Sequence, residues 1–183
     1  RRIKGWSRKK KLALIRGDWE KIARLAKSKS GPLRLAGKAS RSGQASTSSG
    51  RTEIVVMPQV LQELRTHAKK AAPQECCGLL LGQGGQIEAV VPSANVAADP
   101  LTQFEIDPRV LIDAWRTARA GGPEIVGYYH SHPVGAPEPS PCDRDQAAGD
   151  GKVWAIVGRR GEVRFWRDEK TGFTALSYSP EGA

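Results

Sequence analysis

Short stretches rich in apolar residues follow one another along the chain after residue 51; in some of them apolar and polar residues alternate, and others, such as residues 76–82, are continuous apolar runs. Alternation with a period of two, carried by β-branched and aromatic residues, is typical of β-strands. The pattern predicts strands at residues 52–57, 76–82, 86–91, 104–106, 124–129, 153–157, 162–167 and 173–178. Gly84-Gly85 predicts a hairpin turn between the second and third of these, because such a turn needs residues that accept positive φ.

Two other stretches repeat apolar residues every three or four positions, as amphipathic helices do. Residues 58–72 form the first, which begins with a proline and ends at Pro73. Residues 108–120 form the second, which ends at Gly121-Gly122-Pro123. Strands and helices mixed along one chain predict an α/β or α+β fold, in which helices flank a mixed β-sheet.

The first 51 residues differ from the rest. Residues 1–29 combine basic residues with apolar residues partly at helical spacing, which predicts a basic helical tail. Residues 30–51 are rich in Gly, Ser and Ala, so they cannot bury enough surface to offset the entropy lost on ordering. We therefore expect a tail (1–29), a flexible linker (30–51) and a folded domain (52–183).

The charge of the chain follows this division. The 183 residues carry a net charge of +10. Residues 1–51 hold 16 Lys and Arg against 2 Asp and Glu, a net +14, whereas residues 52–183 hold 13 against 17, a net −4. Binding of nucleic acid is therefore expected only through residues 1–51.

Apolar runs and cysteines indicate the compartment. No apolar run approaches the roughly 18 residues that a membrane span needs, and no signal-peptide pattern is present. Three cysteines, two of them adjacent, do not form a useful disulfide framework, which fits a reducing compartment. We expect a cytoplasmic protein without membrane contact, with Cys76, Cys77 and Cys142 as buried thiols. Cys142 keeps a role in metal binding or redox chemistry as an alternative, because it lies between Ser140 and Asp143.

The stretch Tyr129-His130-Ser131-His132-Pro133 holds two of the three histidines of the chain. Side chains at i and i+2 of a strand point to one face, so His130 and His132 can hold one metal ion together. Asp143 can supply a third ligand. Two imidazoles and a carboxylate leave tetrahedral zinc one open position, as in catalytic sites, and imidazole ligands favour zinc among abundant metals. The third histidine, His67, lies among basic residues of a predicted helix, and we interpret it as a solvated surface residue.

A hydrolytic site also needs a group that takes a proton from the attacking water. A carboxylate that does not bind the metal is the usual choice, and Glu75, which opens the apolar strand at 76–82, is the candidate. Ser140 can donate a hydrogen bond to the oxyanion that forms when an amide carbonyl is attacked. The alternative interpretation of Ser140-Pro141-Cys142-Asp143 is a helix start with Ser140 as N-cap. The two roles are compatible, because such a start turns Ser140 and Asp143 toward the same side.

Glu75 lies upstream of His130-x-His132; seven residues separate His132 from Ser140, and two separate Ser140 from Asp143. This set of residues and spacings resembles the JAMM (MPN+) metalloproteases of compact prokaryotic type. The resemblance covers about residues 52–183 and includes Phe104-Glu105-Ile106-Asp107-Pro108. It implies the JAMM/MPN sandwich, which is cytidine-deaminase-like. It also implies one Zn²⁺ per chain on His130, His132 and Asp143, with Glu75 and Ser140 as the catalytic residues.

The resemblance further implies hydrolysis of a peptide or isopeptide bond at the C-terminal Gly-Gly of a ubiquitin-like protein. No large insertion interrupts the domain, so we expect a small ubiquitin-like or sulfur-carrier protein as substrate rather than polyubiquitin. A non-catalytic MPN-type binding scaffold and a nucleic-acid-associated module that acts through the tail are the alternatives. A zinc nucleobase deaminase does not fit, because its H-x-E and P-C-x-x-C pattern is absent.

Residues 2–15 and Gly17-Asp18-Trp19-Glu20 resemble the C-terminal end of the small GIY-YIG endonuclease-like proteins. The match lacks the GIY and YIG strands, so it carries over none of the catalytic residues of that family. The aromatic and basic residues of this segment can contact phosphates and stack on bases. We favour the simpler interpretation of an orphaned helical hairpin whose apolar face has lost its partner.

Overall fold

The structure is a computed structural model that describes residues 53–180. The predicted tail, the linker and the GIY-YIG resemblance lie outside these residues. The helices are α3 (Pro58–Ala71), α4 (Pro108–Arg119) and α5 (Pro141–Gln146). The strands are β1 (Glu53–Val56), β2 (Cys77–Gln83), β3 (Gln86–Ser93), β4 (Glu124–Ser131), β5 (Val153–Val157), β6 (Val163–Glu169) and β7 (Gly172–Pro180).

One predicted strand is wrong. At residues 104–106 the structure has only an isolated bridge between Ile106 and Asn95. The side chain of Asn95 binds the carbonyl oxygen of Gln103 and the backbone N–H of Glu105, so it occupies backbone groups that a neighbouring strand would need. The other predicted strands and both longer helices are present, with ends shifted by at most a few residues.

The sheet is mixed and closes on itself. Its strands hydrogen-bond in the order β1-β3-β2-β4-β5-β6-β7, and the short β1 joins the two ends by pairing in parallel with both β3 and β7. β4 and β5 are also parallel, and the remaining pairs are antiparallel. The predicted mixed sheet with flanking helices is confirmed, and closure by β1 is a feature that the sequence pattern did not indicate.

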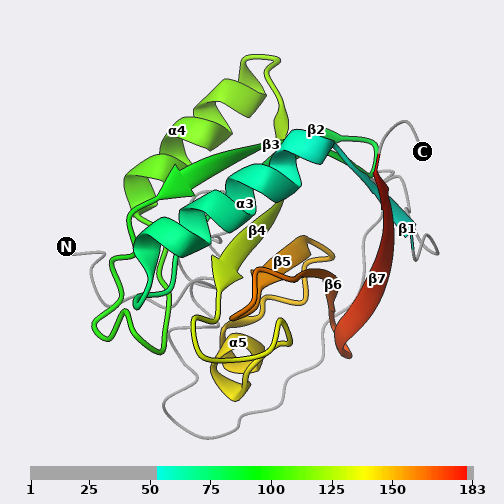
Figure 1. The fold of residues 1–183 in the computed structure, drawn as a ribbon. Coiled ribbons are helices and arrows are strands. Elements are labelled where there is room, and N and C mark those ends of the chain that lie inside the picture. Colours follow the sequence, from blue (N-terminus) through cyan, green and yellow to red (C-terminus); the bar gives the residue numbers. More distant parts are fainter. Residues whose placement is uncertain (1–52, 181–183) are drawn as a thin grey trace, which may run out of the picture.

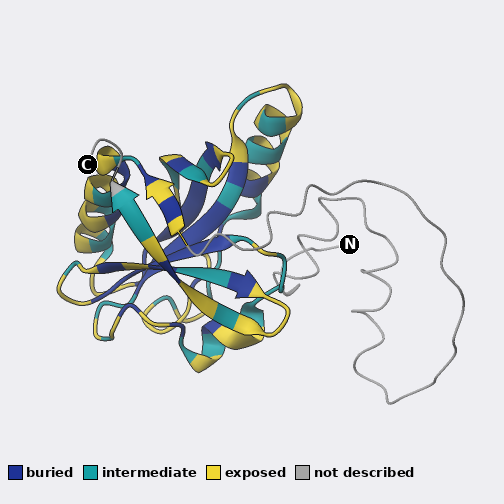
Figure 2. Ribbon diagram, turned by 90° about the vertical axis from the view of Figure 1, so that its right-hand side faces the viewer, coloured by how far each residue is buried: buried dark blue, intermediate teal, exposed yellow. Residues whose placement is uncertain are grey.

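Two apolar clusters lie on opposite faces of the sheet, because successive side chains of a strand alternate between faces. α3 contributes Val60 and Leu64 to one cluster, which includes Tyr129 of β4. α4 contributes Leu111 to the other, which includes Tyr128 of the same strand. Figure 1 shows the two helices flanking the sheet, and Figure 2 shows that the central strands carry most of the buried residues.

Within residues 53–180, no helix combines the length and the apolar character that a membrane span needs.

Candidate metal centre

β4 carries His130 in the middle of the sheet and leads directly into His132. His130 lies opposite Cys77 of β2 on one side and Ile156 of β5 on the other, so its backbone is fixed by two neighbouring strands. Its side chain is fully buried. The ring stacks on Phe104, with centroids 4.3 Å apart and an angle of 13° between the planes, and meets the ring of Trp154 edge-on. In Figure 1 the arrowhead of β4 points toward α5.

His132 lies just past the end of β4, where its backbone N–H donates to the carbonyl of Val157. Its Nδ1 lies 2.9 Å from the carbonyl oxygen of Ala136. A carbonyl only accepts, so Nδ1 carries the proton and Nε2 keeps its lone pair for a ligand. The side chain is 11% exposed, whereas that of His130 is fully buried, so the centre opens to solvent on the His132 side.

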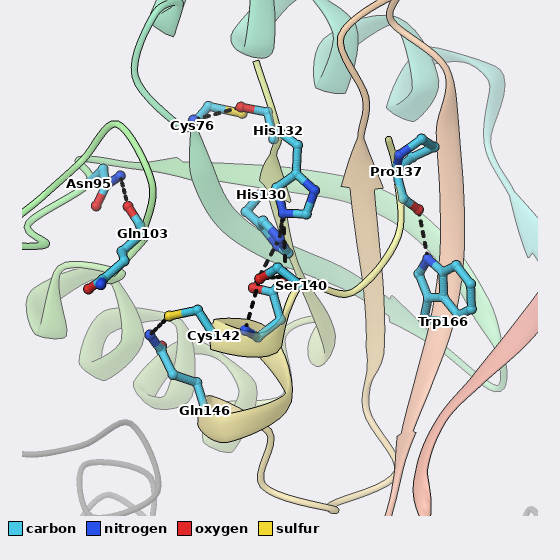
Figure 3. A network of polar contacts seen from close by, with 12 residues as sticks. Cys76, Asn95, Gln103, His130, His132, Pro137, Ser140, Cys142, Gln146 and Trp166 are labelled. Atoms are coloured by element: carbon cyan, nitrogen blue, oxygen red, sulfur yellow. Dashed lines mark hydrogen bonds and ion pairs between the residues drawn. The ribbon is translucent and has the colours of Figure 1, made fainter. Parts of the chain in front are cut away.

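The two imidazoles and Asp143 converge on one point. The Nε2 atoms of His130 and His132 are 3.0 Å apart, and they lie 3.2 and 3.3 Å from the two carboxylate oxygens of Asp143. One ligand atom from each residue falls within 4.8 Å of the others. Figure 3 shows the two rings turned toward the start of α5. The prediction that these three side chains come together agrees with this arrangement.

Asp143 is held by the first turn of α5. Ser140 is the N-cap: its Oγ accepts from the backbone N–H of Asp143 at 3.1 Å, and the Asp143 carboxylate accepts from the backbone N–H of Ser140 at 2.8 Å. This is a capping box, so the cap interpretation of Ser140 is confirmed. The Ser140 hydroxyl also lies 2.8 Å from the carboxylate.

The charge states of Asp143 and His132 favour the binding of a cation. Burial alone would raise the pKa of Asp143, but the charge of His130 and the hydrogen bonds from both histidines and the Ser140 backbone outweigh burial and hold that pKa well below its usual range. For His132, burial lowers the pKa, but its hydrogen bonds to Asp143 and Ala136 raise the pKa by more, so the pKa of His132 lies above its usual value. The carboxylate is therefore ionised, and a bound cation would take the place of the histidine proton.

Glu75 lies just before β2, at the same end of the sheet. It is 7% exposed, and burial raises the pKa of its carboxyl to about 7; the charge of His132 lowers this pKa, and those of Asp143 and Asp99 raise it further. The carboxyl of Glu75 therefore lies close enough to His132 and Asp143 for their charges to change its pKa. A carboxyl that gains and loses a proton near pH 7 is suited to general base and acid work.

The donor set fits zinc. Two imidazole nitrogens and one carboxylate oxygen are ligands that zinc takes in catalytic sites, where a fourth position stays open. The two Nε2 atoms lie 3.0 Å apart and both face the carboxylate of Asp143, so a cation bound between the three groups would take the place of the protons there. His132 has an acceptor on its other ring nitrogen, which is the usual outer support of a metal-binding imidazole.

Two side chains differ from their predicted surroundings. His67 is not a solvated surface residue, since it is half-buried and its Nδ1 lies 2.8 Å from the hydroxyl of Tyr129 on the neighbouring β4. Cys142 is partly exposed rather than buried, and its Sγ accepts from Gln146. Within residues 53–180, the group that can hold a metal does not include Cys142.

Two supporting groups escaped the sequence pattern. Phe104 stacks on His130, and the carbonyl of Ala136 orients His132. In the sequence, Phe104 is recognised only as part of the Phe104-Glu105-Ile106-Asp107-Pro108 stretch of the family resemblance, and no role is assigned to it. A backbone carbonyl leaves no trace in residue identity, but the glycine and prolines of the 133–139 loop indicate a tight turn that can bring such a group back to the histidine.

Known proteins with similar sequences and folds fit this geometry. The family model of prokaryotic homologs of the JAB domain matches residues 57–169. A desampylase of Haloferax volcanii is 36% identical over 126 residues, which cover 67% of this chain and 89% of that protein. A probable TtuB-protein conjugate cleaving protease of Thermus thermophilus is 39% identical over 95 residues, or 51% of this chain and 64% of that protein. The solution structure of a Desulfitobacterium hafniense protein has a TM-score of 0.62 and 27% identity, and the match covers 71% of this chain and 94% of that one.

The matched range contains all five predicted site residues, and it spans more than half of the chain. The predicted resemblance to the JAMM/MPN proteins and the predicted α+β fold are confirmed. The chain therefore belongs to the prokaryotic homologs of the JAB domain, as a compact JAMM-type metallopeptidase.

Proposed function

We propose that the protein is a zinc-dependent peptidase that hydrolyses the amide or isopeptide bond after the C-terminal Gly-Gly of a small ubiquitin-like or sulfur-carrier protein. The observation that carries the proposal is the convergence of His130, His132 and Asp143 beside the buried carboxyl of Glu75. The names of the two relatives, a desampylase and a probable protease that cleaves protein conjugates, support this substrate class.

His130, His132 and Asp143 would hold one zinc ion. When bound, zinc supplies Lewis-acid chemistry that polarises the scissile carbonyl and makes water more acidic. The protein contributes orientation: the Ala136 carbonyl fixes the tautomer of His132, and the capping box fixes the carboxylate of Asp143. Both ligands are therefore set before a substrate arrives.

Glu75 moves the protons. Its carboxylate takes a proton from the attacking water and passes it to the leaving amine as the amide bond breaks. A pKa of about 7 leaves both forms of the carboxyl accessible near neutral pH, as a group with both tasks requires.

Ser140 is the donor that we assign to the oxyanion. Its hydroxyl lies 2.8 Å from an oxygen of Asp143, so this role requires the hydroxyl to turn toward the substrate. Its cap role does not need the hydroxyl hydrogen, because in the cap Oγ accepts from the Asp143 N–H. One residue can thus support the ligand and the reaction at once.

The test combines metal content with turnover. The purified full chain and the His130→Ala variant are loaded with zinc and measured by mass spectrometry. Both are then given a small ubiquitin-like protein whose C-terminal Gly-Gly is joined to a fluorogenic amine. We expect one zinc per wild-type chain, turnover by the wild type, and loss of both in the variant.

Two outcomes would overturn the proposal. A wild-type chain that stays metal-free in zinc-containing buffer would leave a binding scaffold as the better description. A zinc-loaded chain that does not hydrolyse Gly-Gly conjugates would contradict the substrate class and leave the metal centre intact.

A further inference from the structure

Asn95 lies at the start of the loop between β3 and α4, and its side-chain amide uses both of its N–H groups and both lone pairs of its oxygen in hydrogen bonds. Its amide nitrogen donates to the carbonyl of Glu75 at 3.0 Å and to that of Gln103 at 2.9 Å. Its amide oxygen accepts from the backbone N–H of Ala97 at 3.1 Å and of Glu105 at 3.0 Å. One partly buried side chain thus joins both ends of the loop to the backbone of Glu75. Figure 3 shows its contact with Gln103.

The same loop holds the other backbone group of Glu75. The N–H of Glu75 donates to the carbonyl of Pro100 at 2.8 Å. Pro100 belongs to a turn that Asp99 closes, since the Asp99 carboxylate accepts from the backbone N–H of Leu101 and from the hydroxyl of Thr102. Glu75 precedes β2, so its backbone depends on this loop rather than on a strand ladder.

The loop also reaches the metal centre. Phe104 stacks on the ring of His130 and lies between Gln103 and Glu105, the two residues whose backbone Asn95 holds. The remaining ligands do not depend on the loop, because His132 is fixed by Ala136 and Asp143 by the cap of α5. Loosening the loop should therefore displace the proton acceptor more than the metal.

We infer that Asn95 is a positioning residue for Glu75, which sets the distance between the Glu75 carboxyl and the metal centre by fastening the 95–105 loop to the Glu75 backbone. The inference rests on the proposed role of Glu75 in hydrolysis. A displaced proton acceptor slows the chemical step, because proton transfer requires hydrogen-bond reach. Binding of the substrate should change little.

Ser93 offers a matched control. Its hydroxyl fastens the far end of the same loop, by accepting from the backbone N–H of Asp107 at 2.9 Å and donating to the carbonyl of Ala94 at 2.9 Å. It has no hydrogen bond to Glu75 among those of the described residues. Ser93→Ala thus loosens the loop as Asn95→Ala does, but spares the contact with Glu75.

The test measures zinc content, kcat and KM of the full chain for Asn95→Ala, Asn95→Asp and Ser93→Ala, with the fluorogenic Gly-Gly conjugate. Asp keeps an acceptor for Ala97 and Glu105 but loses both donors, so it removes the contacts with the carbonyls of Glu75 and Gln103 and leaves the other two contacts in place. We expect kcat to fall on the order of tenfold to hundredfold in both Asn95 variants, with zinc content and KM nearly unchanged. Ser93→Ala should stay within about threefold of the wild type.

An unchanged kcat in folded, zinc-loaded Asn95→Asp would overturn the inference, and so would equal losses in Asn95→Ala and Ser93→Ala. Amide hydrogen exchange of the segment around Glu75 gives a readout that needs no turnover. Exchange there should be faster in both Asn95 variants than in Ser93→Ala. If the wild type does not hydrolyse the conjugate, the proposed function fails, whereas unchanged exchange refutes the role of Asn95 itself.

Discussion

Glu75 shows how burial can prepare a side chain for proton transfer. Its carboxyl is taken out of water and lies near the negative charges of Asp143 and Asp99, so its pKa rises to about 7. His132 acts in the opposite direction, which ties the proton affinity of Glu75 to the state of the metal centre. Burying a carboxyl at this position costs free energy of folding, and a perturbed carboxyl beside a group of metal-binding side chains is typical of a functional site.

Glu75→Gln should therefore bind zinc as the wild type does and lose turnover. Gln has nearly the same shape but accepts no proton, so kcat should fall by roughly 100-fold or more. Zinc content by mass spectrometry and kcat with a Gly-Gly conjugate check this. Glu88→Gln, which changes an exposed carboxyl on β3, is the control and should leave both unchanged. Retained turnover in Glu75→Gln would refute the assignment.

The raised pKa of Glu75 also predicts how stability of the metal-free protein depends on pH. Between the ordinary pKa of 4.5 and the folded value of about 7, the folded state holds a proton that the unfolded state has released. This contribution is fully present below pH 4.5 and is lost as the pH rises through 7. Gln does not titrate, so the Glu75→Gln variant should not lose this stability. Its free energy of unfolding should therefore rise relative to that of the wild type as the pH rises.

Urea unfolding in the presence of a chelator, at pH 5 and pH 8, measures this difference. Each unit of pKa corresponds to about 1.4 kcal/mol, and solvent at the open side of the centre reduces the effect, so we expect a relative gain of roughly 2 kcal/mol at pH 8. A gain that is the same at both pH values would contradict the prediction.

The first turn of the short helix α5 positions the carboxylate of Asp143. A helix of six residues has little stability of its own, so the capping box of Ser140 and Asp143 holds the first turn and the ligand in one arrangement. Ser140→Ala removes an acceptor for the Asp143 N–H and a donor to its carboxylate. Ser140→Thr keeps both, because threonine is also a favourable N-cap.

We expect Ser140→Ala to lose about 1 kcal/mol of stability and to bind zinc about tenfold more weakly, and Ser140→Thr to resemble the wild type. Chemical unfolding and zinc titration with a competing chelator measure these effects. Turnover at saturating zinc separates the cap role of Ser140 from its proposed role as oxyanion donor. If Ser140→Ala still turns over more slowly than the wild type when fully loaded with zinc, the role as oxyanion donor is supported. Equal zinc affinity in Ser140→Ala and the wild type would refute the cap as a support of the ligand.

Local patterns predicted the elements better than their contacts. The helix starts at Pro58 and Pro108, and the strand that leads into the histidine pair, depend on neighbours in sequence, so periodicity and proline predicted them well. At residues 104–106, where the predicted strand is missing, the side chain of Asn95 binds backbone groups of Gln103 and Glu105, and the alternation of apolar residues gives no sign of these contacts. The misjudged His67 likewise depends on Tyr129, which is 62 residues away in the chain.

Closure of the sheet is the part of the fold that periodicity could not predict. β1 has four residues and pairs with β7, which lies at the other end of the described chain. Pairing between such distant segments is decided by how the whole sheet twists and which edges remain open, rather than by the residues of either strand. For the candidate site, the ligand types follow from the chemistry of zinc and the pairing of His130 with His132 follows from the period of a strand, whereas the complete set of five residues came from the family resemblance.

The charge of the molecule is divided between a strongly basic segment and a mildly acidic domain. Residues 1–51 carry a net +14 and residues 52–183 a net −4. All five residues of the proposed site, and the loop that holds Glu75, lie in the second part. The proposed hydrolysis should therefore not need the basic segment, whereas any attraction to nucleic acid should come from it.

A chain that consists of residues 52–183 tests this division. It should fold, bind one zinc and hydrolyse a small Gly-Gly conjugate with a kcat/KM within about twofold of the full chain, because every contact described around the metal centre lies within it. Binding of double-stranded DNA at low salt should be confined to the full chain and should weaken steeply as salt is added. The decisive measurement is the kcat/KM of the two chains side by side. A large loss in the shorter chain would mean that residues 1–51 take part in binding the substrate, and the alternative of a nucleic-acid module would then no longer be needed to explain their charge.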